Sequence, residues 1–191
     1  PDNLAIAGFT VLFIAAARSL NRQFERDHDA SRSDALTGLR NRRGLLEALD
    51  DVLHRARRSG SPVCVVLADL DHFKRVNDVG GHLRGDAILI AVAKALRDSL
   101  RAQDIVARWG GEEFMLVLPD TDLPGAAHVA EQARQRIASG RFEADGMTFE
   151  LTLSLGVARH APEGDTAETL READRALYQA KTEGRNRTVF A

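Results

Sequence analysis

Two adjacent glutamates, Glu112 and Glu113, stand where a strand would ordinarily carry apolar residues. They follow Gly110 and Gly111, and the four residues lie between the apolar runs DIVA and MLVLP. A glycine pair between two strand-like runs predicts a hairpin turn, but a turn does not need two carboxylates and a buried strand avoids them. The glutamates therefore indicate chemistry at the tip of a hairpin.

A second acidic pair, Asp69 and Asp71, closes the apolar run VCVVLADLD. Residues two apart in an extended chain face the same way, so we expect both carboxylates on one face. The end of this strand can bring Asp69 close to Glu112 or Glu113, and clustered carboxylates repel one another unless a cation lies between them. Mg²⁺ is the usual cation there, with phosphate oxygens completing its shell. Each acid alone is equally well explained as a solvated residue at the end of an element.

The segment FKRVNDVGGHLRGD, residues 73–86, follows directly. The first turn of a helix at this place would expose N–H groups that suit an anion. Asn77 and Asp86 offer the donors and acceptors that a purine edge requires. Near the C-terminus, Lys181 and Arg185 lie about one helical turn apart, which suits a polyphosphate, although such a pair is often only a solvated face.

Helix-like and strand-like periods alternate after residue 34 and define the elements that must position these side chains. We expect helices over residues 41–60, 82–100, 123–138 and 167–182, and strands over residues 62–70, 104–109, 113–118, 149–158 and 188–190. This order predicts an α+β fold: a ferredoxin-like βαββαβ core whose central, mostly antiparallel sheet has flanking helices, packed on one side.

Composition limits the kinds of partner. The chain has 191 residues, a formal net charge of −2 and 44% hydrophobic residues, which suits one globular domain with an appendage. The near-neutral charge gives no electrostatic footprint for duplex DNA, so we expect no DNA partner. The single cysteine, Cys64, excludes an intrachain disulfide and is expected in the core, which fits a reducing compartment.

The N-terminal segment, residues 1–33, is expected to be a separate helix that precedes a domain over residues 34–191. Its run LAIAGFTVLFIAAA, residues 4–17, is apolar on every side and is followed by three arginines. The run is shorter than the roughly 20 residues of a membrane span. Because the chain starts without Met, we expect the end of a truncated transmembrane helix that leaves the rest in the cytoplasm. The alternatives for this run are a buried helix or a dimer seam, and beyond Ala17 we expect the helix to continue as a signalling stalk that could pair with a second copy.

Six segments together resemble the GGDEF family, the diguanylate cyclases. They cover residues 34–191 in the family's order: DALTGLRNRR, DLDHFKRVND, GHLRGD, RWGGEEF, LSLGVA and ADRALYQAKTEGRNR. The resemblance implies a palm-like nucleotide-cyclase fold in which two GTP molecules condense to cyclic di-GMP and two pyrophosphates at a homodimer interface. The expected N-terminal helix would hold this domain on the cytoplasmic side of the bacterial inner membrane.

The metal site that this resemblance implies is Mg²⁺, with Mn²⁺ possible, held by Asp69, Glu112 and the backbone carbonyl of Leu70. Glu113 would assist the metal or deprotonate the attacking 3′-hydroxyl. By position, Asn77 and Asp86 would recognise the guanine base. The phosphates would be bound by the backbone N–H groups of Phe73 and Lys74 and by the side chains of Lys181 and Arg185. Gly110 and Gly111 would leave the hairpin tip bare for the nucleotide.

Two further expectations follow from the resemblance. Arg101 and Asp104, in the segment RAQD, match the family's RxxD product-inhibition site, where the alternative is a local ion pair between exposed groups. Gly80 departs from the family, which usually has a large residue before GH, so we expect a looser loop there.

Three other functions compete with an active cyclase. A degenerate domain could bind GTP or cyclic di-GMP and only relay a signal, but the GGEEF tip is intact. The second competing function is a cyclase that uses ATP, and the third is a purely structural dimerisation module.

Overall fold

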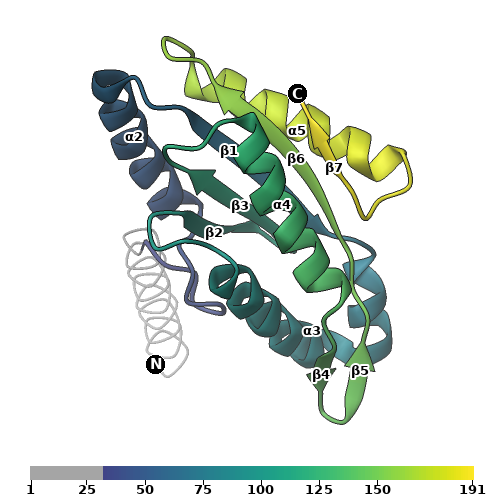
Figure 1. The fold of residues 1–191 in the computed structure, drawn as a ribbon. Helices are drawn as coiled ribbons and strands as arrows, with labels where there is room; N and C mark the ends of the chain where they lie inside the picture. Colours follow the sequence, from purple (N-terminus) through teal and green to yellow (C-terminus); the bar gives the residue numbers. More distant parts are fainter. Residues whose placement is uncertain (1–31) are drawn as a thin grey trace, which may run out of the picture. The chain divides into compact units, whose positions relative to one another are not determined.

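The structure is a computed structural model that describes residues 32–191, of which residues 33–191 form one unit (Figure 1). The expected helix over residues 1–33 lies outside the described residues, apart from the last two, and stays a prediction. The elements are α2 (Arg42–Ser59), β1 (Val63–Leu70), α3 (Phe73–Asp98), β2 (Ile105–Gly110), β3 (Glu113–Leu118), α4 (Leu123–Ala138), β4 (Phe142–Ala144), β5 (Met147–Phe149), β6 (Leu153–His160), α5 (Thr166–Thr182) and β7 (Thr188–Phe190).

Local signals set most of these bounds. The Asn41 side chain accepts a hydrogen bond from the backbone N–H of Gly44, which caps the start of α2. Gly60 then takes a left-handed conformation with φ of 72° and ends the helix. Asp122 caps α4 in the same way as Asn41 caps α2, by accepting from the Gly125 N–H.

The main sheet has the strand order β2-β3-β1-β6-β7. β1 pairs antiparallel with β3 and β6, while β6 and β7 run parallel. This confirms the predicted α+β fold with a mostly antiparallel sheet around a βαββαβ core. In the central strand β1 only Asp69 is not fully buried, so the strand offers a polar side chain at its C-terminal end alone.

The helices cover both faces of the sheet, in contrast to the expected single side. α3 and α4, which belong to the βαββαβ core, pack with Val66 and Ala68 of β1. α2 and α5 pack with Val65 and Leu67, which alternate onto the opposite face (Figure 1). The prediction therefore holds for the two core helices and is wrong for the two that the chain adds before and after the core.

Two local features differ from the expected elements. α3 begins at Phe73, earlier than expected, and is interrupted at Gly81, whose φ of 76° and ψ of 165° are not helical. A separate hairpin of β4 and β5 precedes β6, where one longer strand was expected. Asp145 and Gly146 form its turn, both with positive φ.

The expected membrane anchor needs correction. None of the helices in residues 32–191 is long and apolar enough to cross a bilayer. The apolar run at residues 4–17, on which the expectation rested, lies outside the described residues. Membrane anchoring is therefore not supported.

Candidate active site

The strand register places the predicted acids together. In the β1–β3 pair Asp69 lies directly opposite Glu113, and side chains at such positions share a face with their Cβ atoms about 5 Å apart. The backbone N–H of Leu70 donates to the carbonyl of Glu112 at 3.3 Å, which joins the end of β1 to the hairpin tip. The four residues predicted around a metal thus meet at one corner of the sheet.

A lysine from α5 lies among these carboxylates. The Nζ atom of Lys181 is 2.8 Å from Oδ2 of Asp69. Burial nevertheless raises the pKa of Asp69 above its ordinary value, and the negative charges of Glu112 and Asp71 act in the same direction. Burial also raises the pKa of Glu113, and the charge of Asp69 adds to this effect. One ammonium group does not balance the cluster, so a further cation would stabilise it.

The donor set suits magnesium shared with a nucleotide. Residues 32–191 contain no group of three or more His, Cys, Asp or Glu side chains arranged to hold a metal ion by themselves. Mg²⁺ at nucleotide sites uses one or two carboxylates and takes its other ligands from water and phosphate oxygens. Asp69 and Glu112 provide two carboxylates close enough to influence one another. The chemistry fits, and the ligand assignment stays a prediction.

The tip of the hairpin is bare. A Cβ atom added to Gly110 or Gly111 would meet no atom within 4 Å. Gly111 has φ of 52°, which favours glycine, and a register shift between Arg108 and Gly110 marks an irregularity in the ladder. A flat ligand could therefore approach the backbone of the tip closely.

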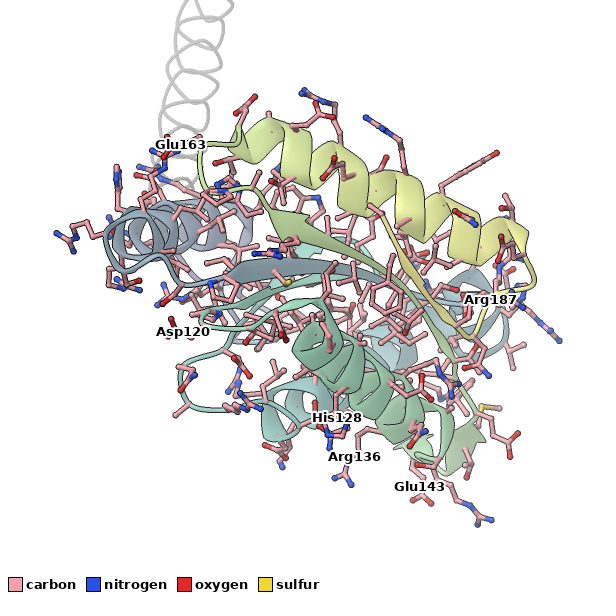
Figure 2. All side chains as sticks on the ribbon, turned by 45° about the horizontal axis from the view of Figure 1, so that its top comes forward. Asp120, His128, Arg136, Glu143, Glu163 and Arg187 are labelled. Atoms are coloured by element: carbon pink, nitrogen blue, oxygen red, sulfur yellow. The ribbon has the colours of Figure 1, made fainter. Side chains whose placement is uncertain are left out.

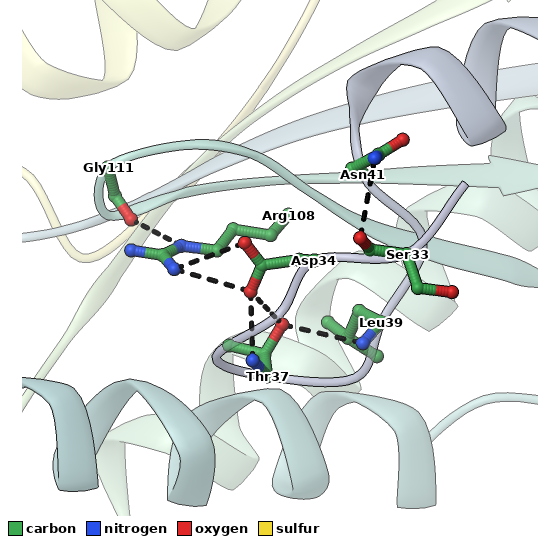
Figure 3. Close-up of polar contacts among 7 residues, drawn as sticks. All are labelled: Ser33, Asp34, Thr37, Leu39, Asn41, Arg108 and Gly111. Carbon is green, nitrogen blue, oxygen red and sulfur yellow. Dashed lines mark hydrogen bonds and ion pairs between the residues drawn. The ribbon is translucent and has the colours of Figure 1, made fainter. Parts of the chain in front are cut away.

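An arginine holds this tip to the start of the fold (Figure 3). The Nε atom of Arg108 donates to the carbonyl oxygen of Gly111 at 2.8 Å, and its Nη1 atom lies 3.3 Å from both carboxylate oxygens of Asp34. Asp34 also accepts from the backbone N–H and the hydroxyl of Thr37. Sequence reasoning missed this connection, although an Asp followed three residues later by Thr is a common turn signal.

The start of α3 leaves donors for an anion. Its N-cap is His72, with φ of 58° and no side-chain capping bond. Phe73 and Lys74 follow in the first turn; the Phe73 side chain is buried and that of Lys74 is exposed. First-turn N–H groups without a side-chain acceptor form a natural anion site, which agrees with the phosphate role predicted for the two amides.

The two predicted guanine contacts lie on either side of the break in α3. Asn77 precedes Gly81 and is half-buried, whereas Asp86 follows it and is exposed. A Cβ atom on Gly85 would lie only 2.0 Å from the side-chain oxygen of Asn77. The absence of a side chain at position 85 therefore lets the amide of Asn77 lie against the second half of the helix, beside Asp86.

The space beside Gly80 is filled from elsewhere. A Cβ atom on Gly80 would be 3.2 Å from the ring of Phe149 in β5 and 3.1 Å from Cβ of Arg84. Arg84 also donates to the Gly80 carbonyl and lies 3.5 Å from Asp145. The helix runs through Gly80, which is buried, and breaks at Gly81, so the looser loop expected there stays a prediction.

Asp71 does not join the acidic cluster as a free carboxylate. It is buried and accepts hydrogen bonds from the hydroxyls of Thr152 and Ser154 and from the backbone N–H of Asn186. Ser154 lies opposite Asp69 in the β1–β6 pair, and the charge of Asp71 still acts on Asp69. Arg185, the second predicted phosphate contact, directly precedes Asn186 and is exposed on the loop after α5.

The predicted inhibitory pair lies at the other end of β2. The backbone N–H of Arg101 donates to Oδ2 of Asp104, and the two residues form a turn just before Ile105. Among the ion pairs of the described residues none joins these two side chains, so the alternative of a local ion pair is wrong. The Arg101 side chain is exposed.

Comparison with known proteins places this geometry in a family. Residues 31–187 match the family model "Diguanylate cyclase, GGDEF domain". The chain belongs to the GGDEF family. This confirms the resemblance drawn from the six segments.

Relatives in the GGDEF family agree in sequence and fold. The response regulator PleD of Caulobacter vibrioides is 44% identical over 160 residues, which are 82% of this chain and 35% of PleD. The chain thus spans about a third of that relative. The diguanylate cyclase SiaD of Pseudomonas aeruginosa, solved with its activator SiaC, has 39% identity and a TM-score of 0.81 over 93% of this chain and 70% of SiaD. The GGDEF domain of DgcB from Caulobacter crescentus, solved with c-di-GMP, has 31% identity and a TM-score of 0.79 over 84% of this chain and 95% of that domain.

Proposed function

We propose that this chain is an active diguanylate cyclase that joins two GTP molecules into cyclic di-GMP and releases two pyrophosphates. The observation that carries the proposal is the under-neutralised cluster of Asp69, Glu112 and Glu113 beside a bare glycine tip. An inactive domain would not need to keep mutually repelling carboxylates at this place.

The reaction is a pair of nucleotidyl transfers. The 3′-oxygen of each GTP forms a bond to the α-phosphorus of the other, the bond between the α-phosphorus and the bridging oxygen breaks, and pyrophosphate leaves. Bound Mg²⁺ would lower the pKa of the 3′-hydroxyl and neutralise charge on the leaving group. Glu113, whose pKa burial raises, would accept the hydroxyl proton.

The remaining assigned residues bind and orient the nucleotide. Asn77 and Asp86 would read the guanine edge across the break in α3. Asp69, Glu112 and the Leu70 carbonyl would hold the metal. The Phe73 and Lys74 amides, with the side chains of Lys181 and Arg185, would bind the phosphates. Gly110 and Gly111 would leave room for the nucleotide at the hairpin tip.

Lys181 would change partner when substrate binds. Its contact with Asp69 neutralises part of the acidic cluster in the protein alone. Once Asp69 is engaged as a metal ligand, the ammonium group of Lys181 would turn to the phosphates. The same lysine would thus stabilise the free site and the loaded site.

A second copy of the chain is required by the stoichiometry. One site holds one GTP, and a cyclic product with two phosphodiester bonds needs two nucleotides facing one another, which a twofold-symmetric homodimer provides. We propose that cyclic di-GMP also binds at Arg101 and Asp104 and slows turnover. The free guanidinium of Arg101 supports this, because its planar fork suits phosphate oxygens and a guanine edge.

Incubation with GTP and Mg²⁺, followed by chromatography, tests the proposal. We expect one cyclic di-GMP and two pyrophosphates for every two GTP consumed, and a specific activity that rises with protein concentration. ATP in place of GTP should give no cyclic product. Binding of GTP or cyclic di-GMP without turnover would instead favour the relay function.

A further inference from the structure

The loop that carries Arg185 has a backbone that its residues do not favour. α5 ends at Thr182, and Arg185 and Asn186 then take φ angles of 63° and 46°. A non-glycine residue in the left-handed region costs roughly 1 kcal/mol or more, although asparagine tolerates it better than most. Two such residues in succession persist only if the surroundings hold them.

The first support comes from the end of β1. The backbone N–H of Asn186 donates to Oδ2 of Asp71 at 3.0 Å. The hydroxyls of Thr152 and Ser154 fix the same carboxylate at 2.7 and 2.6 Å, and Asp71 is only 4% exposed. Since Asp71 is two residues after Asp69, this bond ties the loop to the strand end that carries the acidic cluster.

The second support comes from α4. Arg134 Nη1 donates to the side-chain oxygen of Asn186 at 2.6 Å. The other two nitrogens of Arg134, Nε and Nη2, donate to the two carboxylate oxygens of Glu131 at 2.8 and 2.6 Å. This hydrogen bonding is the main reason that the pKa of Glu131 lies below its ordinary value. Arg134 is therefore held by its own helix, and it fixes the side chain of Asn186 while Asp71 fixes its backbone.

We propose that Arg134 and Asn186 are positioning residues for nucleotide binding: they hold the loop after α5 so that Arg185 faces the triphosphate. The inference rests on the proposed function, because that function assigns Arg185 to the phosphates. Arg134 and Asn186 act through the backbone of the loop and contact no part of the nucleotide themselves. Their effect should therefore vanish when the Arg185 side chain is absent.

The test measures binding of 3′-deoxy-GTP with Mg²⁺ by calorimetry. This nucleotide lacks the attacking hydroxyl, so it binds without turnover. Arg134→Gln should weaken binding about 3- to 10-fold, because Arg185 would be displaced without being lost and the effect then matches one ordinary hydrogen bond. Asn186→Gly should do the same, because it removes the amide while glycine still permits the left-handed backbone. In the Arg185→Ala background, Arg134→Gln should cause no further loss.

Arg136→Gln is the matched control. Arg136 lies on the same helix, is exposed, and points away from the sheet (Figure 2), so its replacement should leave the affinity unchanged. Equal affinities of wild type and Arg134→Gln would overturn the inference, as would an equal loss with and without Arg185. Wild-type protein that binds 3′-deoxy-GTP yet makes no cyclic di-GMP from GTP would contradict the proposed function and leave this inference standing.

Discussion

Two acidic regions flank the same hairpin, and the fold treats their charges in opposite ways. Burial acts to raise the pKa of Asp34, but hydrogen bonds from Thr37 and the charge of Arg108 outweigh it and lower the pKa. At Asp69 and Glu113 burial prevails over the charge of Lys181 and raises the pKa. Each region has one basic partner, yet only in the first is the carboxyl pKa lowered.

The direction of the pKa shift distinguishes a carboxylate that stabilises the fold from carboxylates that serve the reaction. A carboxylate with several donors, such as Asp34, stabilises the conformation that surrounds it. Carboxylates that repel one another weaken the fold, and such perturbed groups concentrate where function requires them. The first region should therefore respond to mutation mainly through stability, and the second mainly through turnover.

The largest expected effect is loss of turnover in the second region. Asp69→Asn or Glu112→Gln should lower turnover by about 10³-fold or more, because metal-held charge contributes several kcal/mol to the reaction barrier. The melting temperature in EDTA should stay the same or rise, since mutual repulsion is removed. Product chromatography and thermal unfolding measure the two quantities. Wild-type rates at saturating Mg²⁺ would refute the metal assignment.

In the first region stability should fall instead. Asp34→Ala removes the acceptor for Thr37 and Arg108 and should lower the free energy of unfolding by roughly 1–3 kcal/mol. Turnover should fall several-fold because the hairpin tip loses its fixed position. Urea unfolding tests this, with Asp51→Ala on the exposed face of α2 as the control. A variant as stable as the control would mean that the Arg108 contacts contribute little.

A third acid, Asp104, lies in the turn before β2 and extends the comparison. Asp104 is occupied by the backbone of Arg101, and the Arg101 side chain is left for a ligand. Arg101→Ala should keep initial rates near wild type but form several times more product before the reaction slows. Calorimetry with cyclic di-GMP should show binding that the variant has lost. Identical progress curves for the two proteins would exclude product inhibition at this turn.

The smallest expected effect is the pH dependence of Asp34. The pKa of Asp34 in the folded protein lies below its ordinary value, so ionised Asp34 stabilises the fold near neutral pH. This stabilisation is lost as the pH falls through the folded-state pKa. The difference in melting temperature between wild type and Asp34→Asn should be constant near neutral pH and shrink below about pH 4. A melting-temperature difference that grows as the pH falls would contradict this prediction.

Much of the site could be predicted because short motifs lie at the ends of elements. Asp69 ends a strand and Glu113 begins one, so a correct hairpin and a correct sheet bring them together. Asp71 adds its charge to the surroundings of Asp69, but its carboxylate is occupied by hydrogen bonds that the sequence did not predict. Its partner Asn186 is 115 residues away, a distance that local patterns do not reach.

The fold errors have signals that the sequence does contain. β1 is apolar at every position except Asp69, a pattern typical of a strand covered on both faces. Read in this way, it would have predicted helices on both sides. The β4–β5 hairpin was missed although Asp145-Gly146 is a strong two-residue turn signal. Each of its strands has only three residues, too few to show a period.

The close approach of Gly85 to Asn77 bears on how activity is judged across natural variants. Surveys that look only for an intact GGEEF tip would accept a chain in which position 85 carries a side chain. With a Cβ atom 2.0 Å from its oxygen, the Asn77 amide could not keep its place, so we expect such a chain to lose guanine selectivity while keeping its acids. Nucleotide competition assays on natural members that have GGEEF but lack this glycine would show whether their selectivity for guanine is lost.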